Sequence, residues 1–407
     1  MTLSTNEISV TFFALALLLL SSFIFGKIFE KINAPKVVGE IVGGMVFGGS
    51  CLGLLSPELM NSIFNNYAEE GKVLNIFYQL GLVFLMFSSG FSTSINITKK
   101  NIKPYSMLFL GATVIPMLLG IGFIDYFEED FMGTANNSIS FGIVFLIATA
   151  ITSIPVISKI FFDINMMNTK FSNMVLTVST IQDLCLWILL NLAIGMAENE
   201  NITILSLLIN VIATIGFLTI AKLLEYIIKK KSIHVRNNIL TISFLVILTC
   251  VFSMSLLNIN IMYSAFISGY IMKALVGEDN KEVLSIKEVA FALFIPIYFA
   301  LVGIKLDVIH NFSITRFILF FIVVFGLEFI GTVGVMLFSK FKKKTIISLG
   351  ITMNARGGPG IVLATTAYSF NIINLEFYTV LILTTMLSSA IAGYWLRIYK
   401  NDVKDEG

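Results

Sequence analysis

The sequence predicts an all-α membrane protein with thirteen transmembrane helices, inverted six-helix repeats and two discontinuous helices. Hydrophobic residues make up 57% of the 407 residues and charged residues only 13%, whereas soluble domains are about 45–50% apolar and about 25% charged. Apolar stretches recur along the whole chain, so a signal peptide does not explain the excess. Two segments late in the chain also repeat features of two earlier segments.

Thirteen segments have about the 20 apolar residues that are needed to cross a bilayer. The polar segments between them are short, and the sequence ends soon after the last one. We therefore expect one membrane transporter unit over 1–407, without a soluble regulatory domain. The second segment is rich in glycine, and a partly re-entrant course is the alternative there. The expected spans are 8–26, 37–55, 73–92, 104–124, 138–160, 171–196, 202–225, 238–256, 260–276, 289–305, 314–339, 345–368 and 374–396.

The lysines and arginines predict the orientation of these spans. If the N-terminus lies outside, nearly all of the 27 basic residues fall in loops on one side. Lys72, Lys305 and Arg316 are the exceptions on the opposite side, and Arg356 lies within a span. Because basic loops face the cytoplasm, we expect the N-terminus outside, the C-terminus inside, and a multi-pass protein of the cytoplasmic membrane.

Two pairs of segments indicate an internal repeat. Segments 82–94 and 296–307 each carry a glycine late in an aromatic-rich span, and the interrupted run 148–156 has its counterpart in the Gly-rich run 353–360. Each pair is seven spans apart, an odd number, so the two halves would have opposite orientation. Interrupted spans at matching positions of inverted repeats indicate a transport site near the midplane. Chance similarity between Gly-rich membrane helices is the alternative.

Asp183 is the most informative single residue, because it lies in the middle of an apolar span. An acid there costs roughly 2.5–3.5 kcal/mol on insertion scales and usually marks an ion or proton path. A structural role in helix packing is the alternative. In the preceding span, Pro155 removes a backbone donor and frees carbonyl groups. The hydroxyls of Thr152 and Ser153 either bond back to their own helix or offer oxygen ligands to a cation.

Three sequence runs resemble the monovalent cation:proton antiporters of the second superfamily, which includes NapA-type sodium/proton antiporters and Kef-type potassium efflux systems. These are Ala34-Pro-Lys-Val-Val-Gly-Glu-Ile-Val-Gly-Gly44, the pair Gln182-Asp183, and Met353-Asn-Ala-Arg-Gly357. The resemblance covers nearly the whole chain, and the order of the motifs makes it specific although each motif alone is weak.

The resemblance implies an NapA/NhaA-like fold with crossed, broken fifth and twelfth spans, and a homodimer with two domains in each subunit. A core domain, over about 73–196 and 289–396, would move like an elevator against a dimer or scaffold domain over about 8–55 and 202–276. Relatives carry Asn, Asp or Gln at the position of Gln182, so this residue is either a ligand or a hydrogen-bond partner of a neighbouring helix.

Four further polar residues are supporting or gating candidates. Glu40 belongs to a Gly-Glu pair that relatives share, and gating and packing are equally good interpretations. Asn354 and Arg356 lie in the broken twelfth span, where an arginine offsets the dipoles of half-helices or pairs with an acid. Many relatives have a lysine near the position of Glu328, so the chain departs from the family there. We hypothesise that a Glu328–Arg356 ion pair replaces that arrangement.

The leading function is exchange of Na⁺ or K⁺ for H⁺, with Asp183 carrying either ion and Thr152 among the cation ligands. Gln182 replaces the second acid of electrogenic relatives, so we expect electroneutral exchange. The alternative is sodium-coupled uptake of a small organic solute. A channel and an ATP-driven pump are disfavoured, because no repeated carbonyl-filter sequence and no Gly-x-x-x-x-Gly-Lys-[Ser/Thr] motif occurs.

We expect no enzyme activity, no cofactor beyond the transported ions and no nucleic-acid partner. The partners expected are the lipid bilayer and a second copy of the chain, and the sequence does not say whether a separate regulatory subunit exists. Cys51, Cys185 and Cys250 lack metal-ligand spacing, and His234 and His310 stand alone. A metal centre built from these residues is therefore not expected.

Overall fold

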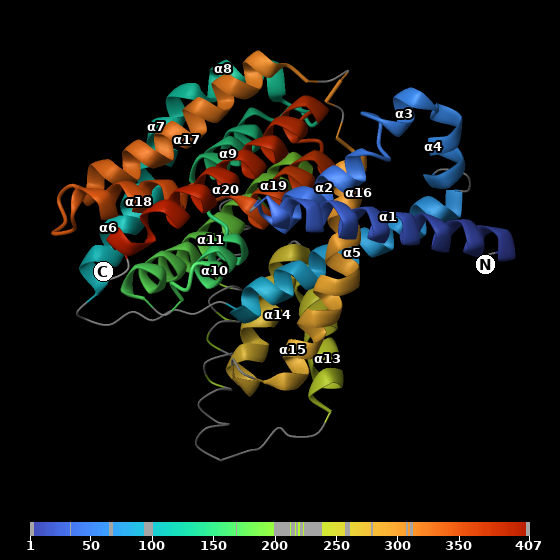
Figure 1. The fold of residues 1–407 in the computed structure, drawn as a ribbon, viewed down its shortest axis with the longest axis horizontal. Coiled ribbons are helices and arrows are strands. Elements are labelled where there is room, and N and C mark those ends of the chain that lie inside the picture. The colour runs from blue at the N-terminus through green and yellow to red at the C-terminus, as the bar shows by residue number, and fades with distance from the viewer. Residues whose placement is uncertain are drawn as a thin grey trace. The chain divides into compact units, whose positions relative to one another are not determined.

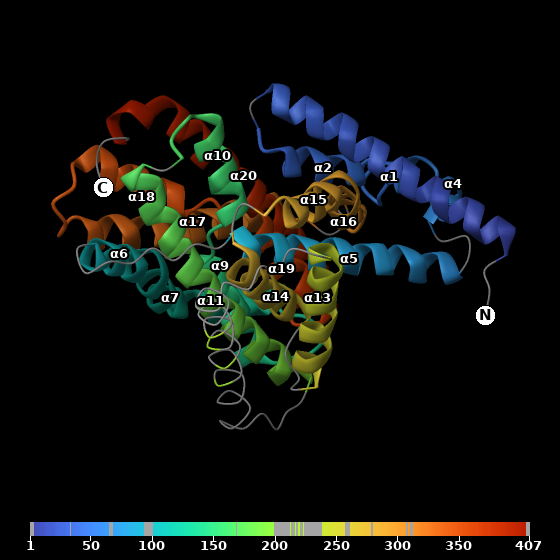
Figure 2. The ribbon, with the colours of Figure 1, turned by 90° about the horizontal axis from the view of Figure 1, so that it is seen from below.

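The computed structural model describes residues 4–32, 34–64, 68–92, 101–167, 169–198, 238–256, 261–277, 280–306, 308–309 and 312–403, with single residues at 212, 216, 219 and 223. Within these residues the secondary structure is helical apart from one isolated bridge between Met132 and Ile373. Figures 1 and 2 show the helices from two directions. The expected span 202–225 lies outside the described residues except for four isolated positions, so the count of thirteen spans stays a prediction.

Eight of the described helical segments are long and apolar enough to cross a membrane. They cover Thr5–Lys31, Gly71–Ser92, Ile102–Phe131, Ser138–Phe162, Lys170–Glu198, Lys281–Ile304, Ile314–Met336 and Leu375–Val403, and two shorter apolar helices cover Ile239–Ser255 and Ile261–Val276. Each of these ten coincides with a span expected from the sequence. The expected span 345–368 is formed by two shorter helices with a break between them.

The expected span 37–55 is not a continuous helix. Helix α2 (Lys36–Met45) ends early, and turns follow before the short helix α3 (Leu52–Leu55). Glycines at 43, 44, 48 and 49 account for this end, because glycine lowers helix stability by roughly 1 kcal/mol per residue. The helix in this expected span therefore ends at Met45, within the Gly-rich segment for which the sequence also allows a partly re-entrant course.

The contacts within the chain divide it into two compact units. Unit 1 comprises residues 1–31, 36–93 and 202–306, and unit 2 comprises 32–35, 94–201 and 307–407. The described elements of unit 1 are α1 (Thr5–Lys31), α2, α3, α4 (Pro57–Phe64), α5 (Ala68–Ser92), α13 (Ile239–Ser255), α14 (Ile261–Val276), α15 (Lys281–Val289), η3 (Ala290–Phe294) and α16 (Ile295–Ile304). Packing thus groups α5 and α16 with α1, whereas the resemblance assigned 73–92 and 289–305 to the core domain. Which helices move together stays a prediction.

Unit 1 contains several close helix crossings at glycines, including two that join its first and second halves along the chain. A Cβ atom on Gly90 of α5 would lie 1.9 Å from the carbonyl oxygen of Phe266 in α14. One on Gly303 of α16 would lie 2.0 Å from the carbonyl oxygen of Ile41 in α2. Small residues of this kind let membrane helices approach closely, which provides packing where the hydrophobic effect cannot.

Unit 2 holds both interrupted spans. Its elements are α6 (Ile102–Phe109), the π-helical turn η1 (Leu110–Val114), α7 (Ile115–Gly120), η2 (Ile121–Phe123), α8 (Ile124–Phe131), α9 (Ser138–Ala150), α10 (Ile154–Asp163), α11 (Lys170–Glu198), α17 (Ile314–Met336), α18 (Lys343–Met353), α19 (Gly357–Ser369) and α20 (Leu375–Val403). Gly111 in η1 and Gly331 in α17 allow these elements to touch, since a Cβ on Gly111 would lie 2.9 Å from the Gly331 carbonyl oxygen.

A cluster of buried phenylalanines lies in unit 2, between α8, α9, α17 and α20. Phe131 stacks on Phe377 with ring centroids 4.6 Å apart, and Phe320 meets Phe377 edge-on at 5.0 Å. Phe127, Phe141 and Phe145 complete the cluster. Offset and edge-on contacts stabilise aromatic pairs beyond the burial of their area, so the cluster helps to hold these four helices together.

Candidate functional site: a buried carboxylate beside two crossed helix breaks

The first helix break separates α9 from α10 at residues 151–153. In a continuous helix the N–H of residue 155 would bond to the carbonyl of Ile151, and proline has no N–H to donate. Ser153 instead caps α10, where its hydroxyl accepts a hydrogen bond from the backbone N–H of Val156 at 3.4 Å. Polar side chains at this position favour the start of a helix. The interruption near Thr152 expected from the sequence is confirmed.

The second break separates α18 from α19 at residues 354–356. Gly357 begins α19 with a φ of +38°, and a Cβ there would lie 2.3 Å from Cγ2 of Val156 and 2.6 Å from Oγ of Ser153. Only glycine satisfies both constraints. Its N–H donates to the hydroxyl of Ser389 in α20 at 3.0 Å.

The two breaks touch each other through short hydrogen bonds. The N–H of Ser153 donates to the carbonyl of Ala355 at 2.6 Å, and the hydroxyl of Thr152 donates to the carbonyl of Met353 at 2.6 Å. Crossed, broken spans, which the resemblance implied, are therefore present in unit 2. Of the two sequence interpretations of Thr152, back-bonding to its own helix is wrong, because its hydroxyl bonds across to the other break.

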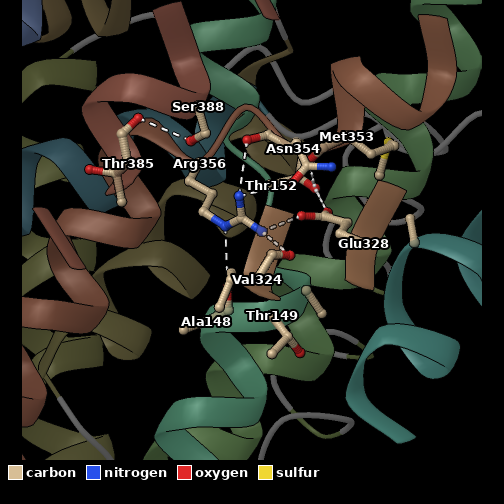
Figure 3. Close-up of polar contacts among 12 residues, drawn as sticks. Ala148, Thr149, Thr152, Val324, Glu328, Met353, Asn354, Arg356, Thr385 and Ser388 are labelled. Carbon is tan, nitrogen blue, oxygen red and sulfur yellow. Dashed lines mark hydrogen bonds and ion pairs between the residues drawn. The ribbon is translucent and has the colours of Figure 1, made fainter. Parts of the chain in front are cut away.

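Arg356 is buried and donates in five hydrogen bonds (Figure 3). Nε bonds to the carbonyl of Ala148 at 3.1 Å, and Nη1 bonds to Asn354 through its side-chain oxygen at 2.9 Å and its carbonyl at 3.5 Å. Nη2 bonds to the carbonyl of Val324 at 3.2 Å and to Glu328 Oε2 at 2.7 Å. Since a guanidinium has five N–H groups, Arg356 has no donor left for another ligand. It ties α9, α17 and the second break together.

Glu328 of α17 forms the hypothesised ion pair with Arg356, which is thereby confirmed. Its other oxygen accepts a hydrogen bond from the hydroxyl of Thr152 at 3.3 Å. Both members of the pair are almost completely buried. Asn354 supports the pair, because its amide N–H₂ donates to the carbonyl of Gly350 at 2.9 Å and so directs the amide oxygen towards Arg356.

Gln182 of α11 connects the first break to the π-helical turn. Its amide N–H₂ donates to the carbonyl of Ala150, the last residue of α9, and to the carbonyl of Ala112 in η1 at 3.2 Å. Helix C-termini leave carbonyls without an intrahelical partner, and π-turns often occur at functional sites. Gln182 is thus a hydrogen-bond partner of neighbouring helices. Its amide oxygen accepts no hydrogen bond from the described residues.

Asp183, the next residue, is 1% exposed, and neither carboxylate oxygen accepts a hydrogen bond from any described residue. Ser179 lies one helical turn earlier on the same face of α11, and its buried hydroxyl also has no partner among the described residues. An ionised carboxylate without a partner in an apolar interior is strongly unfavourable. No described residue forms a hydrogen bond that would stabilise a negative charge on Asp183.

Sequence reasoning missed Ser179, although the signal was present. A hydroxyl four residues before a membrane-buried acid lies directly above it on a helix, and the run Ser179-Thr-Ile-Gln-Asp183 has this spacing. Of the expected site residues, eight lie in unit 2 around the breaks and on α11 and α17. Glu40 instead belongs to α2 in unit 1, where it is buried and pairs with Lys36 at 3.2 Å.

Comparison with known proteins decides the family. The family model described as "Sodium/hydrogen exchanger, transmembrane" matches residues 15–401. The chain belongs to this sodium/hydrogen exchanger family. It is accordingly a multi-pass membrane protein, in agreement with its long apolar helices.

Several curated relatives of this exchanger family are similar over almost the whole chain. The Na⁺/H⁺ antiporter of Enterococcus hirae is 23% identical over 96% of this chain and 98% of its own length. Cation/H⁺ antiporter 18 of Arabidopsis thaliana is 22% identical over 90% of this chain and 46% of its own length. K⁺/H⁺ antiporter 1 of Saccharomyces cerevisiae is 23% identical over 95% of this chain and 46% of its own length. The chain thus spans about half the length of the Arabidopsis and yeast relatives.

Among solved structures, the sodium proton antiporter MjNhaP1 from Methanocaldococcus jannaschii has a similar fold. The TM-score is 0.64 at 16% sequence identity, with 98% of this chain and 99% of the other covered. At this identity the similarity shows the fold alone and does not identify the transported ion.

Proposed function

We propose that the chain is a secondary antiporter of the cell membrane that exchanges Na⁺ or K⁺ for H⁺ at Asp183. The observation that carries this proposal is a completely buried carboxylate without a hydrogen-bond partner among the described residues. The preceding residue, Gln182, donates to the carbonyl of Ala150 at the first helix break. A proton and a cation each neutralise the Asp183 carboxylate, and they exclude one another. Such competition for one carboxylate couples the two fluxes in both directions.

The groups around Asp183 are of the kind that a dehydrated monovalent cation requires. Unwound backbone near a half-helix supplies carbonyl oxygens in transporters of this architecture, and the break at 151–153 is a source of them here. Ser179 adds a hydroxyl oxygen on the face of Asp183. We propose Asp183 and Ser179 as side-chain ligands, with Thr152 and Ser153 contributing mainly through the backbone that their hydroxyls hold in place.

The exchange is proposed to be electroneutral because, among the described acids of the site, Asp183 alone has a charge that is not already balanced. Glu328 and Arg356 neutralise each other at 2.7 Å. Gln182 is uncharged, and its amide donates to two carbonyls. One proton therefore exchanges for one monovalent cation, and the membrane potential contributes no driving force.

Thirteen spans in inverted repeats, with the N-terminus outside, complete the proposal. The two glycine crossings support the repeat, because Gly90 in the third span meets the ninth, while Gly303 in the tenth span meets the second. Because repeated spans lie seven apart, the third span corresponds to the tenth and the second to the ninth. A two-fold axis between the halves would therefore convert one of these two contacts into the other. We also propose a homodimer and an elevator-like alternation of access, as the family resemblance implies.

Charge along unit 2 supports the proposed orientation. The helical run 102–131 is about 45 Å long at 1.5 Å per residue, and Lys103 lies at its start. Its other end, α8, carries Asp125, Glu128, Glu129 and Asp130. A lysine at the start of the run and no lysine or arginine in α8 agree with a cytoplasmic start.

Purified protein in proteoliposomes, loaded with a pH-sensitive dye, tests the proposed exchange. Adding Na⁺ or K⁺ outside is expected to change the internal pH in the absence of any organic solute. A pH change or ion uptake that requires an organic solute would instead establish symport. No response to either cation under any gradient would contradict the proposal.

A further inference from the structure

The end of unit 2 where α17 passes into α18 carries a dense run of positive charge. Lys340, Lys342, Lys343 and Lys344 lie within five residues, and all four side chains are exposed. We call these four residues the lysine cluster. The positive-inside rule explains basic residues on this side of the membrane, but it does not require four of them in one short connection.

Apolar side chains lie immediately before the lysine cluster at the end of α17. Phe338 is 86% exposed and Leu337 is 58% exposed. At the end of a membrane-crossing helix these side chains are available to acyl chains, while the lysines one turn further on reach the level of the headgroups. The segment therefore offers an apolar surface and a cationic surface to the same partner.

The C-terminal end of α20 lies at the same end of unit 2, as Figures 1 and 2 show. Lys344 and Asp402 connect the two segments at 3.1 Å, and Trp395 donates to the hydroxyl of Ser348 at 3.0 Å. Trp395 also packs on Tyr399 with ring centroids 4.3 Å apart, and Tyr394 is 72% exposed. Tryptophan and tyrosine favour the interface between acyl chains and headgroups, which places the lysine cluster at headgroup depth.

The opposite end of unit 2 shows that this positive charge is not a general property of the unit. The acids of α8 lie there, and Arg316 is paired with Asp130 at 2.9 Å and with Glu376 at 2.6 Å. Anionic partners are therefore attracted to one end of unit 2 and repelled from the other.

We propose that the lysine cluster, together with Leu337 and Phe338, binds the headgroup and upper acyl chains of an anionic phospholipid. Clusters of four or more basic residues next to a membrane helix attract anionic lipids. Each lysine or arginine near the surface raises the affinity about fivefold. The assignment to the cytoplasmic leaflet rests on the orientation proposed above, whereas binding itself does not. Occupancy would fix the α17–α18 connection, which lies between Glu328 and the second break along the chain.

The test uses the purified full-length chain in detergent, titrated with dioleoylphosphatidylglycerol or dioleoylphosphatidylcholine while its thermal unfolding is followed. The anionic lipid is expected to raise the melting temperature, and phosphatidylcholine is not. In the double variant Lys340→Gln/Lys343→Gln the concentration that gives half the effect is expected to rise about 25-fold. Lys344 is left unchanged because it pairs with Asp402.

The matched control is Lys103→Gln/Lys170→Gln, which removes two exposed lysines from helix starts of the same unit. This control is expected to change the half-effect concentration less than threefold. Equal shifts of the half-effect concentration in both double variants would overturn the proposal, since the lipid would then respond to diffuse surface charge and not to the lysine cluster. Stabilisation of the unaltered protein by inorganic phosphate alone would also overturn it, in favour of a free-anion site. Neither readout depends on ion transport, so the outcome is independent of the proposed exchange.

Discussion

Asp183 and Glu328 are both acids in the middle of apolar helices, yet their surroundings differ completely. Glu328 accepts hydrogen bonds from Arg356 and Thr152, whereas Asp183 accepts none from the described residues. Both are almost fully buried, so burial does not distinguish them. Under the proposed exchange, the acid with a fixed partner serves the fold, and the acid without a partner is available to a transported ion.

Arg356, the partner of Glu328, is itself held by several hydrogen bonds. Arg356 cannot turn towards Asp183 without leaving the carbonyls of Ala148 and Val324 and the side chain of Asn354. Removing one partner of such a pair is costly because it leaves an unbalanced charge in the interior. Substitutions at Glu328 are accordingly expected to destabilise the fold, whereas substitutions at Asp183 are expected to abolish transport.

The largest expected effect is a complete loss of exchange in Asp183→Asn. The amide binds neither a proton nor a cation in the way that a carboxylate does, and no charge remains to be balanced. The melting temperature should stay at or above that of the unaltered protein, because a buried carboxylate without partners is removed. Dye-loaded proteoliposomes measure the exchange, with Asp125→Asn on the exposed face of α8 as the control. Substantial exchange by Asp183→Asn would remove the distinction between the two acids.

Breaking the ion pair is expected to lower stability by about 3–5 kcal/mol. We expect this for Arg356→Gln and for Glu328→Gln alone, and a smaller loss than their sum for the double variant, because it leaves no unpaired charge. Chemical or thermal unfolding of the three variants forms a double-mutant cycle. Strictly additive losses would show that the two residues do not interact.

Gly357→Ala tests whether the crossing of the breaks depends on close contact. An alanine at φ +38° with Val156 Cγ2 only 2.3 Å from its Cβ is expected to cost about 2–4 kcal/mol. Gly334→Ala in α17 is the matched control, since nothing lies within 4 Å of a Cβ there. The control should be neutral or stabilising by up to about 1 kcal/mol. Thermal unfolding that is the same for both variants would contradict the described crossing.

Much of this arrangement follows from the sequence, because membrane insertion constrains it strongly. Asp183 is conspicuous in an apolar span, and Pro155 and the Gly357–Gly360 run mark the two breaks by removing donors and side chains. These features depend on residue type alone. The Glu328–Arg356 pair is suggested instead by the family resemblance, because many relatives have a lysine near the position of Glu328.

The features that sequence did not reveal depend on three-dimensional neighbours. The two carbonyls bridged by Gln182 belong to α9 and to η1, far apart along the chain. That Thr152 bonds to Met353 instead of its own helix depends on how the breaks cross. The Gly-rich composition of 37–55 indicates an irregular course but not the residue, Met45, at which α2 ends. For Glu40 the sequence favours gating and packing equally, and the structure pairs this residue with Lys36.

Ser179→Ala is expected to have a smaller effect than the substitutions above, and to change the apparent KM for the cation and not the stability. Loss of one hydroxyl ligand should raise the apparent KM for the cation about tenfold. Stability should change little, because this hydroxyl has no partner among the described residues. Thr152→Val should show the reverse pattern, with lower stability, since its hydroxyl bonds to Met353 and Glu328. Initial exchange rates over a range of Na⁺ and K⁺ concentrations measure the KM, and an unchanged KM in Ser179→Ala would exclude it as a ligand.

The membrane potential is expected to have no effect on exchange, and this measurement tests the central claim most directly. If Glu328 stays paired with Arg356 through the cycle, Asp183 alone carries charge, and one proton moves for each cation. Each uncompensated charge would add about 2.3 kcal/mol of driving force per 100 mV, which a rate measurement detects easily. Na⁺-driven proton movement in proteoliposomes should therefore proceed at the same rate with and without a valinomycin-imposed potassium diffusion potential. A clear dependence on that potential would show that a second group titrates, and would contradict the assignment of Glu328 as a fixed partner.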